Sequence, residues 1–256
     1  MRVAAIYDIH GNLPALEAVL AEIRQADVDQ LVVGGDVLPG PMPRETLDCL
    51  LDLEIPVRFI SGNGERVVVE QMHGKESNEV PQQFREVIRW NAQQLLPEDE
   101  QRLAGWPKTV CVQVRGLGEV LFCHATPRND VEIFTRLTSE DRLLPVFEGV
   151  DAPVVVCGHT HMQFDRTVGS VRVVNAGSVG MPFAPPPGAY WLLLGPDVQL
   201  RHTPYDLVKA ADRIRHTTCP QAEDLAVRYV LHPPSEEETL AAFSKAELKQ
   251  ETIRQP

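Results

Sequence analysis

The sequence has few cysteines, no long apolar run and a deficit of positive charge. Its five cysteines form no Cys-x-x-Cys pair, so a disulfide framework is not predicted and a reducing compartment fits better. No apolar run approaches the roughly 18 residues that span a bilayer. Asp8 interrupts the N-terminal apolar segment where a secretory signal would have to continue. We therefore expect a cytoplasmic protein without a membrane partner.

The charge balance limits the partners further. The chain has 24 lysines and arginines against 36 acidic residues, a net charge of −12. Such an acidic chain disfavours nucleic-acid binding, which relies on contacts between basic side chains and phosphates. An anionic substrate would need local help from metal cations or a few arginines. Assembly into a homo-oligomer stays open.

Short apolar runs alternate with helical patterns in the first 62 residues. The runs Val3–Tyr7, Leu31–Val33 and Val57–Ile60 predict buried strands. A helix beginning after Asn12 and a second over Pro43–Leu53 separate them. This order is typical of parallel βαβ units, so we expect an α/β fold.

The remaining sequence predicts a second set of strands. They are expected at residues 110–114, 120–123, 154–157, 164–168, 171–174, 190–194 and 198–202, with helical patterns at 65–106, 130–137 and 140–147. We expect two sheets flanked by helices in one domain over residues 1–204. A helical tail over residues 205–256 is expected to pack on that domain or to extend from it.

Polar side chains follow the apolar runs of the N-terminal segment. Asp8 and His10 come directly after the first run, and the period of two of an extended chain would point both in the same direction. Asp36 follows the second run and Asn63 follows the third. Each alone has an ordinary explanation, because aspartate and asparagine also form turns and cap helices.

Three histidines continue the pattern. His124 follows the run at 120–123, and His159 and His161 follow the run at 154–157. Ligands of open α/β sheets bind beyond the carboxyl ends of the strands. Seven ligand-competent side chains at the ends of five runs therefore predict a metal site.

The residue types indicate which metals bind there. Carboxylates, imidazoles and one amide, without a thiolate, suit Mn, Fe, Zn or Ni. Seven ligands exceed the needs of one ion with an open position, so we expect two divalent ions sharing a bridging carboxylate. Ions about 3.5–4 Å apart generate hydroxide at neutral pH and clamp the attacking and leaving oxygens of an in-line displacement at phosphorus.

The same residues occur as five ordered motifs. They read Asp8-Ile9-His10, Gly35-Asp36, Gly62-Asn63-Gly64-Glu65, His124 and Gly158-His159-Thr160-His161. This pattern resembles the calcineurin-like metallophosphoesterase superfamily, and the stretch Asn-Ala-Gly-Ser-Val-Gly at 175–180 resembles its small bacterial phosphodiesterase branch. The resemblance covers about residues 1–204 and implies a four-layer αββα sandwich of two mixed sheets flanked by helices, with the metals at the sheet edges.

The resemblance also implies roles for individual residues. One ion would be held by Asp8, His10 and His161, the other by Asn63, His124 and His159, with Asp36 bridging. A hydroxide bridging the ions would attack phosphorus, and the catalytic residues would include Asn12, Asn63 and His124. Asn12 would hydrogen-bond the phosphate, although a helix cap explains it equally well. Arg66 and Arg128 are candidates for phosphate binding or plain surface residues.

One position departs from the superfamily pattern. Gly64 stands where most members have a histidine that contacts phosphate and is placed to protonate the leaving oxygen. Losing a general acid costs about 10²–10⁴-fold, and least for leaving groups that depart easily as anions, such as nitrophenolate. Members of the small bacterial branch often lack this histidine as well. His73, on the polar segment after Gly64, is a candidate replacement, with a surface histidine as the alternative.

Three functions compete on these observations. The first is a metal-dependent phosphoesterase that hydrolyses phosphodiesters, and monoesters as a further class. The second is a catalytically weak or non-enzymatic interaction module of the same fold, which only Gly64 favours. The third is a nucleotide-binding protein that uses Gly34-Gly35, and the lack of a GxGxxG or GxxxxGK[ST] motif disfavours it. The complete ligand set favours the phosphoesterase.

Overall fold

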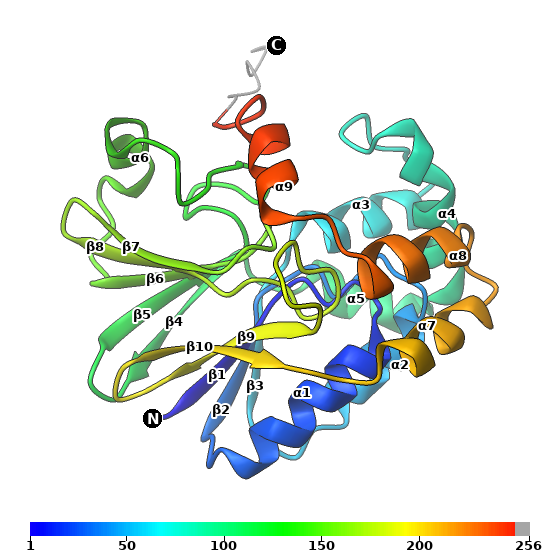
Figure 1. Ribbon diagram of the computed structural model, residues 1–256, viewed down its shortest axis with the longest axis horizontal. Coiled ribbons are helices and arrows are strands. Elements are labelled where there is room, and N and C mark those ends of the chain that lie inside the picture. Colours follow the sequence, from blue (N-terminus) through cyan, green and yellow to red (C-terminus); the bar gives the residue numbers. More distant parts are fainter. Residues whose placement is uncertain (249–256) are drawn as a thin grey trace.

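Two five-stranded sheets pack face to face and carry helices on their outer faces (Figure 1). This computed structural model describes residues 1–248. The first sheet has the order β10-β9-β1-β2-β3 and the second β4-β5-β6-β8-β7. Both sheets mix parallel and antiparallel neighbours. The expected αββα sandwich is confirmed.

The first sheet contains the predicted βαβ units. Strands β1 (Val3–Ile6), β2 (Gln30–Val33) and β3 (Val57–Phe59) are parallel. Helices α1 (Leu13–Gln25) and α2 (Pro43–Leu51) connect them. The hairpin of β9 (Ala189–Leu194) and β10 (Val198–Thr203) joins β1 in antiparallel orientation.

The second sheet is built from the middle of the chain. It contains β4 (Thr109–Val114), β5 (Gly118–Cys123), β6 (Val154–Cys157), β7 (Phe164–Val168) and β8 (Val171–Asn175). Strands β5, β6 and β8 are parallel to one another. Helix α6 (Glu140–Phe147) lies on the outer face of this sheet, near β7 (Figure 1).

Two groups of helices lie at the other side of the molecule. The segment between β3 and β4 forms α3 (Asn63–Met72), η1 (Gln82–Phe84), α4 (Arg85–Gln94) and α5 (Pro97–Ala104). The chain after β10 forms α7 (Leu207–Arg215), α8 (Ala222–Leu225), the π-helical turn η2 (Ala226–Leu231) and α9 (Glu236–Phe243). No helix among residues 1–248 is long and apolar enough to span a membrane.

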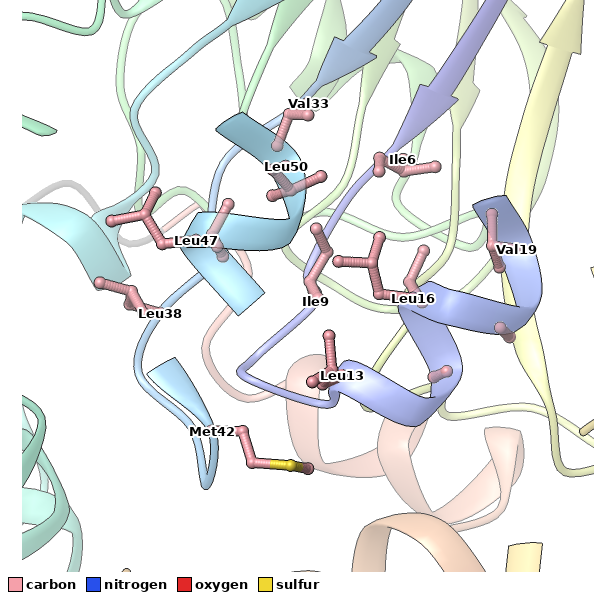
Figure 2. Packing of buried hydrophobic residues seen from close by; sticks show 14 of the residues in the cluster. Ile6, Ile9, Leu13, Leu16, Val19, Val33, Leu38, Met42, Leu47 and Leu50 are labelled. Atoms are coloured by element: carbon pink, nitrogen blue, oxygen red, sulfur yellow. The ribbon is translucent and has the colours of Figure 1, made fainter. Parts of the chain in front are cut away.

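Alternation along β1 builds the two apolar layers on its faces. Ile6 faces α1 and α2, which contribute Leu16 and Leu47 to the same core (Figure 2), and Ala4 is buried in this core as well. Val3, Ala5 and Tyr7 face the second sheet instead and pack in a core with residues of β5, β6 and β9. Both faces of β1 are therefore buried, which explains its continuous apolar run.

One predicted helix is wrong. Residues 130–137, where a helical pattern was predicted, are irregular rather than helical. The Asn129 carboxamide accepts hydrogen bonds from the backbone of Val131 and Glu132, and the Thr138 hydroxyl accepts one from Thr135 N at 2.9 Å. Such local side-chain acceptors compete with helical hydrogen bonds.

Phe122 of β5 is fully buried in the core between the two sheets. We expect Phe122→Ala to lower the free energy of unfolding by about 3–5 kcal/mol, because it removes buried apolar area and leaves a cavity. Leu137→Ala is the control, since Leu137 is 63% exposed and its replacement should change stability by less than about 0.5 kcal/mol. Urea unfolding measures both, and equal effects would contradict the assignment of this core.

Candidate metal centre

All seven predicted ligands converge at one edge of the sandwich. Six of them form two clusters in which the ligand atoms lie within 4.8 Å of one another: Asp8, His10 and His161 in the first, and Asp36, His124 and His159 in the second. Asn63 joins the second cluster, with its Oδ1 3.1 Å from His124 Nε2. These side chains follow β1, β2 and β3 of one sheet and β5 and β6 of the other.

Asp36 lies between the two clusters. Its Oδ2 is 3.8 Å from His10 Nε2, and its Oδ1 is 3.5 Å from His124 Nε2. Gly64 N donates a hydrogen bond to the same Oδ1 at 2.7 Å. Each carboxylate oxygen therefore faces a different cluster, an arrangement suited to a bridging ligand.

Backbone carbonyls orient the imidazole rings. In His10, His124 and His161, Nδ1 lies 2.7–3.2 Å from a backbone carbonyl oxygen. A proton on Nδ1 donates to that oxygen and leaves the lone pair of Nε2 facing the cluster. This is the usual arrangement of histidines that ligate a metal.

Two contacts in the centre require a cation or a proton. Asp8 Oδ1 is buried without a hydrogen-bond partner, although a buried carboxylate oxygen without a partner is costly. His10 Nε2 and His161 Nε2 are only 3.2 Å apart, so two lone pairs would face each other in the neutral rings. A divalent cation satisfies both contacts, and the residues fit a metal centre.

Burial sets the protonation of the ligands. It lowers the pKa of His10 to about 3 and that of His159 to about 3, so both rings are neutral at pH 7 and able to ligate. Burial raises the pKa of Asp36 to about 7. Burial also acts to raise the pKa of Asp8, but the neighbouring His161 outweighs it and holds that pKa below its ordinary value.

The loops at the strand ends hold five ligands in an unusual backbone conformation. The φ angles are 52° at Asp8, 47° at His10, 50° at Asp36, 65° at His159 and 59° at His161. This left-handed region costs a non-glycine residue about 1–3 kcal/mol. The extended geometry predicted for Asp8 and His10 is wrong, although both side chains reach the same cluster.

Glu65 organises these loops, a role that the sequence reasoning missed. Its carboxylate accepts hydrogen bonds from the backbone N–H groups of Asp36 (2.9 Å), Leu38 (3.1 Å) and Gly62 (2.8 Å), and the residue is only 1% exposed. It ties the loop after β2 to the start of α3. Its position three residues after Gly62, where a capping-box acid stands, was the available signal.

Two further supporting residues follow β8. The Ser178 hydroxyl donates to Asp8 O at 2.7 Å and accepts from Met181 N at 2.8 Å. The Phe183 ring stacks on the His161 imidazole, with 4.7 Å between centroids. Both fix residues of the first cluster. Ser178 lies in the stretch at 175–180 that carried part of the resemblance, whereas no pattern in the sequence distinguished Phe183 from ordinary loop residues.

Asn12 is a helix cap in this structure. Its Oδ1 accepts from Ala15 N at 3.2 Å, at the start of α1. Its Nδ2 donates to Gly180 O at 2.9 Å and to Tyr205 Oη at 3.3 Å. Because its amide hydrogens are already bonded, a contact between Asn12 and phosphate requires the longer of these bonds to break.

Both candidate arginines form ion pairs with acidic side chains. Arg66 pairs with Asp130 at 2.8 Å and with Glu79 at 2.7 Å. Arg128 pairs with Glu132, whose carboxylate oxygens lie 2.8 Å from its Nε. Phosphate binding by either arginine stays a prediction.

The backbone at Gly64 leaves no room for a side chain. A Cβ at this position would lie 2.0 Å from Leu38 O and 2.8 Å from Asp36 Oδ1. His73 does not supply the missing group. It is the C-cap of α3, roughly 15 Å along the helix from Asn63, and its 64% exposed ring pairs with Glu100 at 3.0 Å.

The comparison with protein families decides the identity of this fold. The family model described as the calcineurin-like phosphoesterase superfamily domain matches residues 1–194. The chain belongs to this superfamily. The predicted resemblance is thereby confirmed, and both groups of candidate metal ligands lie within the matched residues.

One relative and two solved structures are similar to this chain over most of its length. The chain is 26% identical over 239 residues to the uncharacterized protein MJ0912 of Methanocaldococcus jannaschii, covering 86% of this chain and 94% of the relative. It is similar to a metallophosphoesterase from Sphaerobacter thermophilus, with 26% identity, a TM-score of 0.69 and coverage of 89% and 98%. The fold also matches the hypothetical protein PH1004 from Pyrococcus horikoshii, with 20% identity, a TM-score of 0.76 and coverage of 91% and 99%.

The raised pKa of Asp36 predicts how the metal-free protein responds to pH. The folded protein keeps the Asp36 proton up to about pH 7, whereas the unfolded chain releases it near pH 4. The stability that protonated Asp36 contributes to the metal-free protein should therefore be lost as pH rises from about 4 to about 7. The lowered pKa values of His10 and His159 act in the opposite direction over part of this window. Asp36→Asn cannot ionise, so its stability at pH 7.5 relative to pH 5 should be higher than that of the wild type. Urea unfolding with chelator at pH 5 and pH 7.5 measures the difference.

The matching control adds Mn²⁺ at pH 7.5. Metal should stabilise the wild type, because a ligand that binds only the folded state adds to its stability, and it should stabilise Asp36→Asn much less. An equal pH dependence in the two metal-free proteins would contradict the assignment of the buried proton to Asp36.

The close approach at Gly64 generates a second prediction. Gly64→His introduces the residue that most of the superfamily has, yet it should lower both stability and activity, because its Cβ meets the Leu38 carbonyl. Thermal unfolding and hydrolysis of bis(p-nitrophenyl) phosphate measure the two effects. Gly105→His is the control, since a Cβ at that position meets nothing closer than 3.2 Å and its φ, like that of Gly64, is not left-handed. A gain of activity in Gly64→His would show that the backbone yields.

Proposed function

We propose that this chain is a metal-dependent phosphoesterase that hydrolyses phosphodiesters, and phosphomonoesters as a second class. The observation that carries the proposal is the position of Asp36, with one carboxylate oxygen toward each of two ligand clusters. Two ligand sets that share one carboxylate suit a binuclear centre. The complete set favours catalysis over an interaction module of the same fold.

The proposed ligands divide as the clusters do. Asp8, His10 and His161 hold one ion, Asn63, His124 and His159 hold the other, and Asp36 contacts both. When bound, two ions chosen among Mn, Fe, Zn and Ni activate water and neutralise charge on the phosphoryl oxygens. The chain's own part is to keep the rings of His10 and His159 neutral by burial. Contacts between Nδ1 and backbone carbonyls orient the rings of His10, His124 and His161, and Glu65 fixes the loops.

The leaving group receives no proton from the position that usually supplies it. Gly64 carries no side chain, and His73 lies at the far end of α3. Esters whose leaving oxygen departs as a stable anion should therefore react fastest. Aryloxide leaving groups are therefore favoured over simple alkoxide leaving groups.

We also propose that the tail after residue 204 belongs to the same domain. Ala210 and Ile214 of α7 and Leu225 of α8 are buried in the core that α1 and α2 share. Residues 249–256 of the predicted tail lie outside the described part of the chain. The five unpaired cysteines support the expected cytoplasmic location.

Hydrolysis of bis(p-nitrophenyl) phosphate with added Mn²⁺ tests the function. Wild type should release nitrophenolate, and chelation should abolish the rate. Asp36→Ala should lower kcat/KM by more than about 100-fold, the upper end of the cost of losing a group that only orients a ligand. His73→Ala is the matched control and should keep the wild-type rate and pH profile. No metal-dependent release by folded wild type would reject the proposal.

A further inference from the structure

An apolar cavity of about 490 Å³ opens from the metal centre. His10, Asp36, Asn63 and His159 line one end of it. The walls beyond these ligands are almost entirely apolar and include Val80, Phe84, Val131, Ile133, Ile214 and Tyr229. The volume lies within the range of pockets that bury most of a small ligand. The cavity is much larger than one phosphate group requires.

The charges around the cavity exclude one class of substituent. No lysine or arginine lines it within residues 1–248, and the only acid in its walls besides Asp36 is Glu79. Glu79 pairs with Arg66, whose guanidinium also pairs with Asp130. A second phosphate, sulfate or carboxylate buried here would have no cationic partner, which is costly.

Two parts of the chain far apart in sequence close this cavity. Val80 and Phe84 come from the segment between α3 and α4, whereas Ile214 and Tyr229 come from the tail. The two parts meet where Gln221 Nε2 donates to Gln83 O at 2.7 Å, and Figure 1 shows α7 and α8 on the same side of the molecule as α4. The tail lies beyond residues 1–194, which the family model matches.

The tail also reaches the metal centre through aromatic rings. The Tyr229 ring centroid is 6.5 Å from that of Phe183, which in turn stacks on His161. A group bound in the cavity therefore lies between the metal ligands and a wall formed by the tail. The tail lies outside the residues that the family model matches.

We propose that the substrate is a phosphoester that carries one uncharged, apolar alkyl or aryl substituent, which this cavity binds. The proposal rests on the phosphoesterase function proposed above and names its substrate class. The tail and the segment between α3 and α4 determine the specificity, and the metal clusters determine the chemistry. Nucleotides and other substrates with a second anionic group are poor substrates.

A series of alkyl p-nitrophenyl phosphates with ethyl, butyl and octyl groups tests the substrate class. All have the same leaving group, so differences report on the alkyl substituent. We expect kcat/KM to rise roughly fourfold per added CH₂ while the chain fits the cavity, as burial of methylene groups predicts. An analogue of the butyl ester with a terminal carboxylate should react more slowly than the butyl ester.

Three Val→Lys variants locate the effect. Val80→Lys and Val131→Lys place a cation in walls that are partly exposed, and both should lose the gain from longer chains while the ethyl ester still reacts. Val208→Lys is the matched control, because Val208 is 71% exposed on α7 and does not line the cavity. It should keep the wild-type dependence on chain length. Circular dichroism checks that each variant folds.

Binding of octan-1-ol to the metal-free protein, measured by calorimetry, separates the two proposals. Octanol should bind wild type and Val208→Lys but not the two cavity variants. Hydrolysis that is independent of chain length, without octanol binding, overturns the apolar cavity and leaves the phosphoesterase intact. Octanol binding without hydrolysis of any ester overturns the phosphoesterase and with it the substrate class.

Discussion

The apolar contact between the two sheets fixes the position of every candidate metal ligand. Tyr7 lies at this contact, where its hydroxyl donates to Val156 O of the opposite sheet at 3.1 Å. The next residue of that strand end is Asp8, and the loop after Val156 carries His159 and His161. A shift of one sheet against the other would separate ligands that belong to one cluster. The buried valines and Phe122 of the contact are therefore as necessary to the centre as the ligands themselves.

The same packing creates the electrostatic problem that the centre must solve. Two carboxylates and four imidazoles are largely buried here, and Asp8 Oδ1 accepts no hydrogen bond from residues 1–248, although His161 Nε2 lies 3.3 Å away. Gly64 N donates to Asp36 and stabilises part of this charge, whereas the backbone N–H groups on Glu65 stabilise a further buried carboxylate. The remaining charge is negative, the sign that divalent cations balance. Hydrogen bonds from the protein thus fix the geometry of the site, and bound metal ions would balance its negative charge.

Much of this arrangement could be predicted from sequence, because parallel strands deliver their following residues to one edge and the ligand types are distinctive. Asp36 and His124 could be identified as candidate ligands from their position after an apolar run. The role of Glu65 could not be read in the same way, since its three partners are backbone groups. The helix expected at 130–137 is absent because the side chains of Asn129 and Thr138 compete locally for backbone donors. The cavity could not be predicted from the sequence, because segments about 130 residues apart form its walls.

The left-handed backbone at five ligands has a consequence for how this protein tolerates change. Glycine would adopt the same loop shapes without a steric penalty, so Asp and His are retained there for their side chains and against the preference of the backbone. Selection for heat resistance alone would therefore favour replacements that dismantle the centre. A thermostable form has to gain its stability elsewhere, for example on the outer helices, if it is to remain a working catalyst.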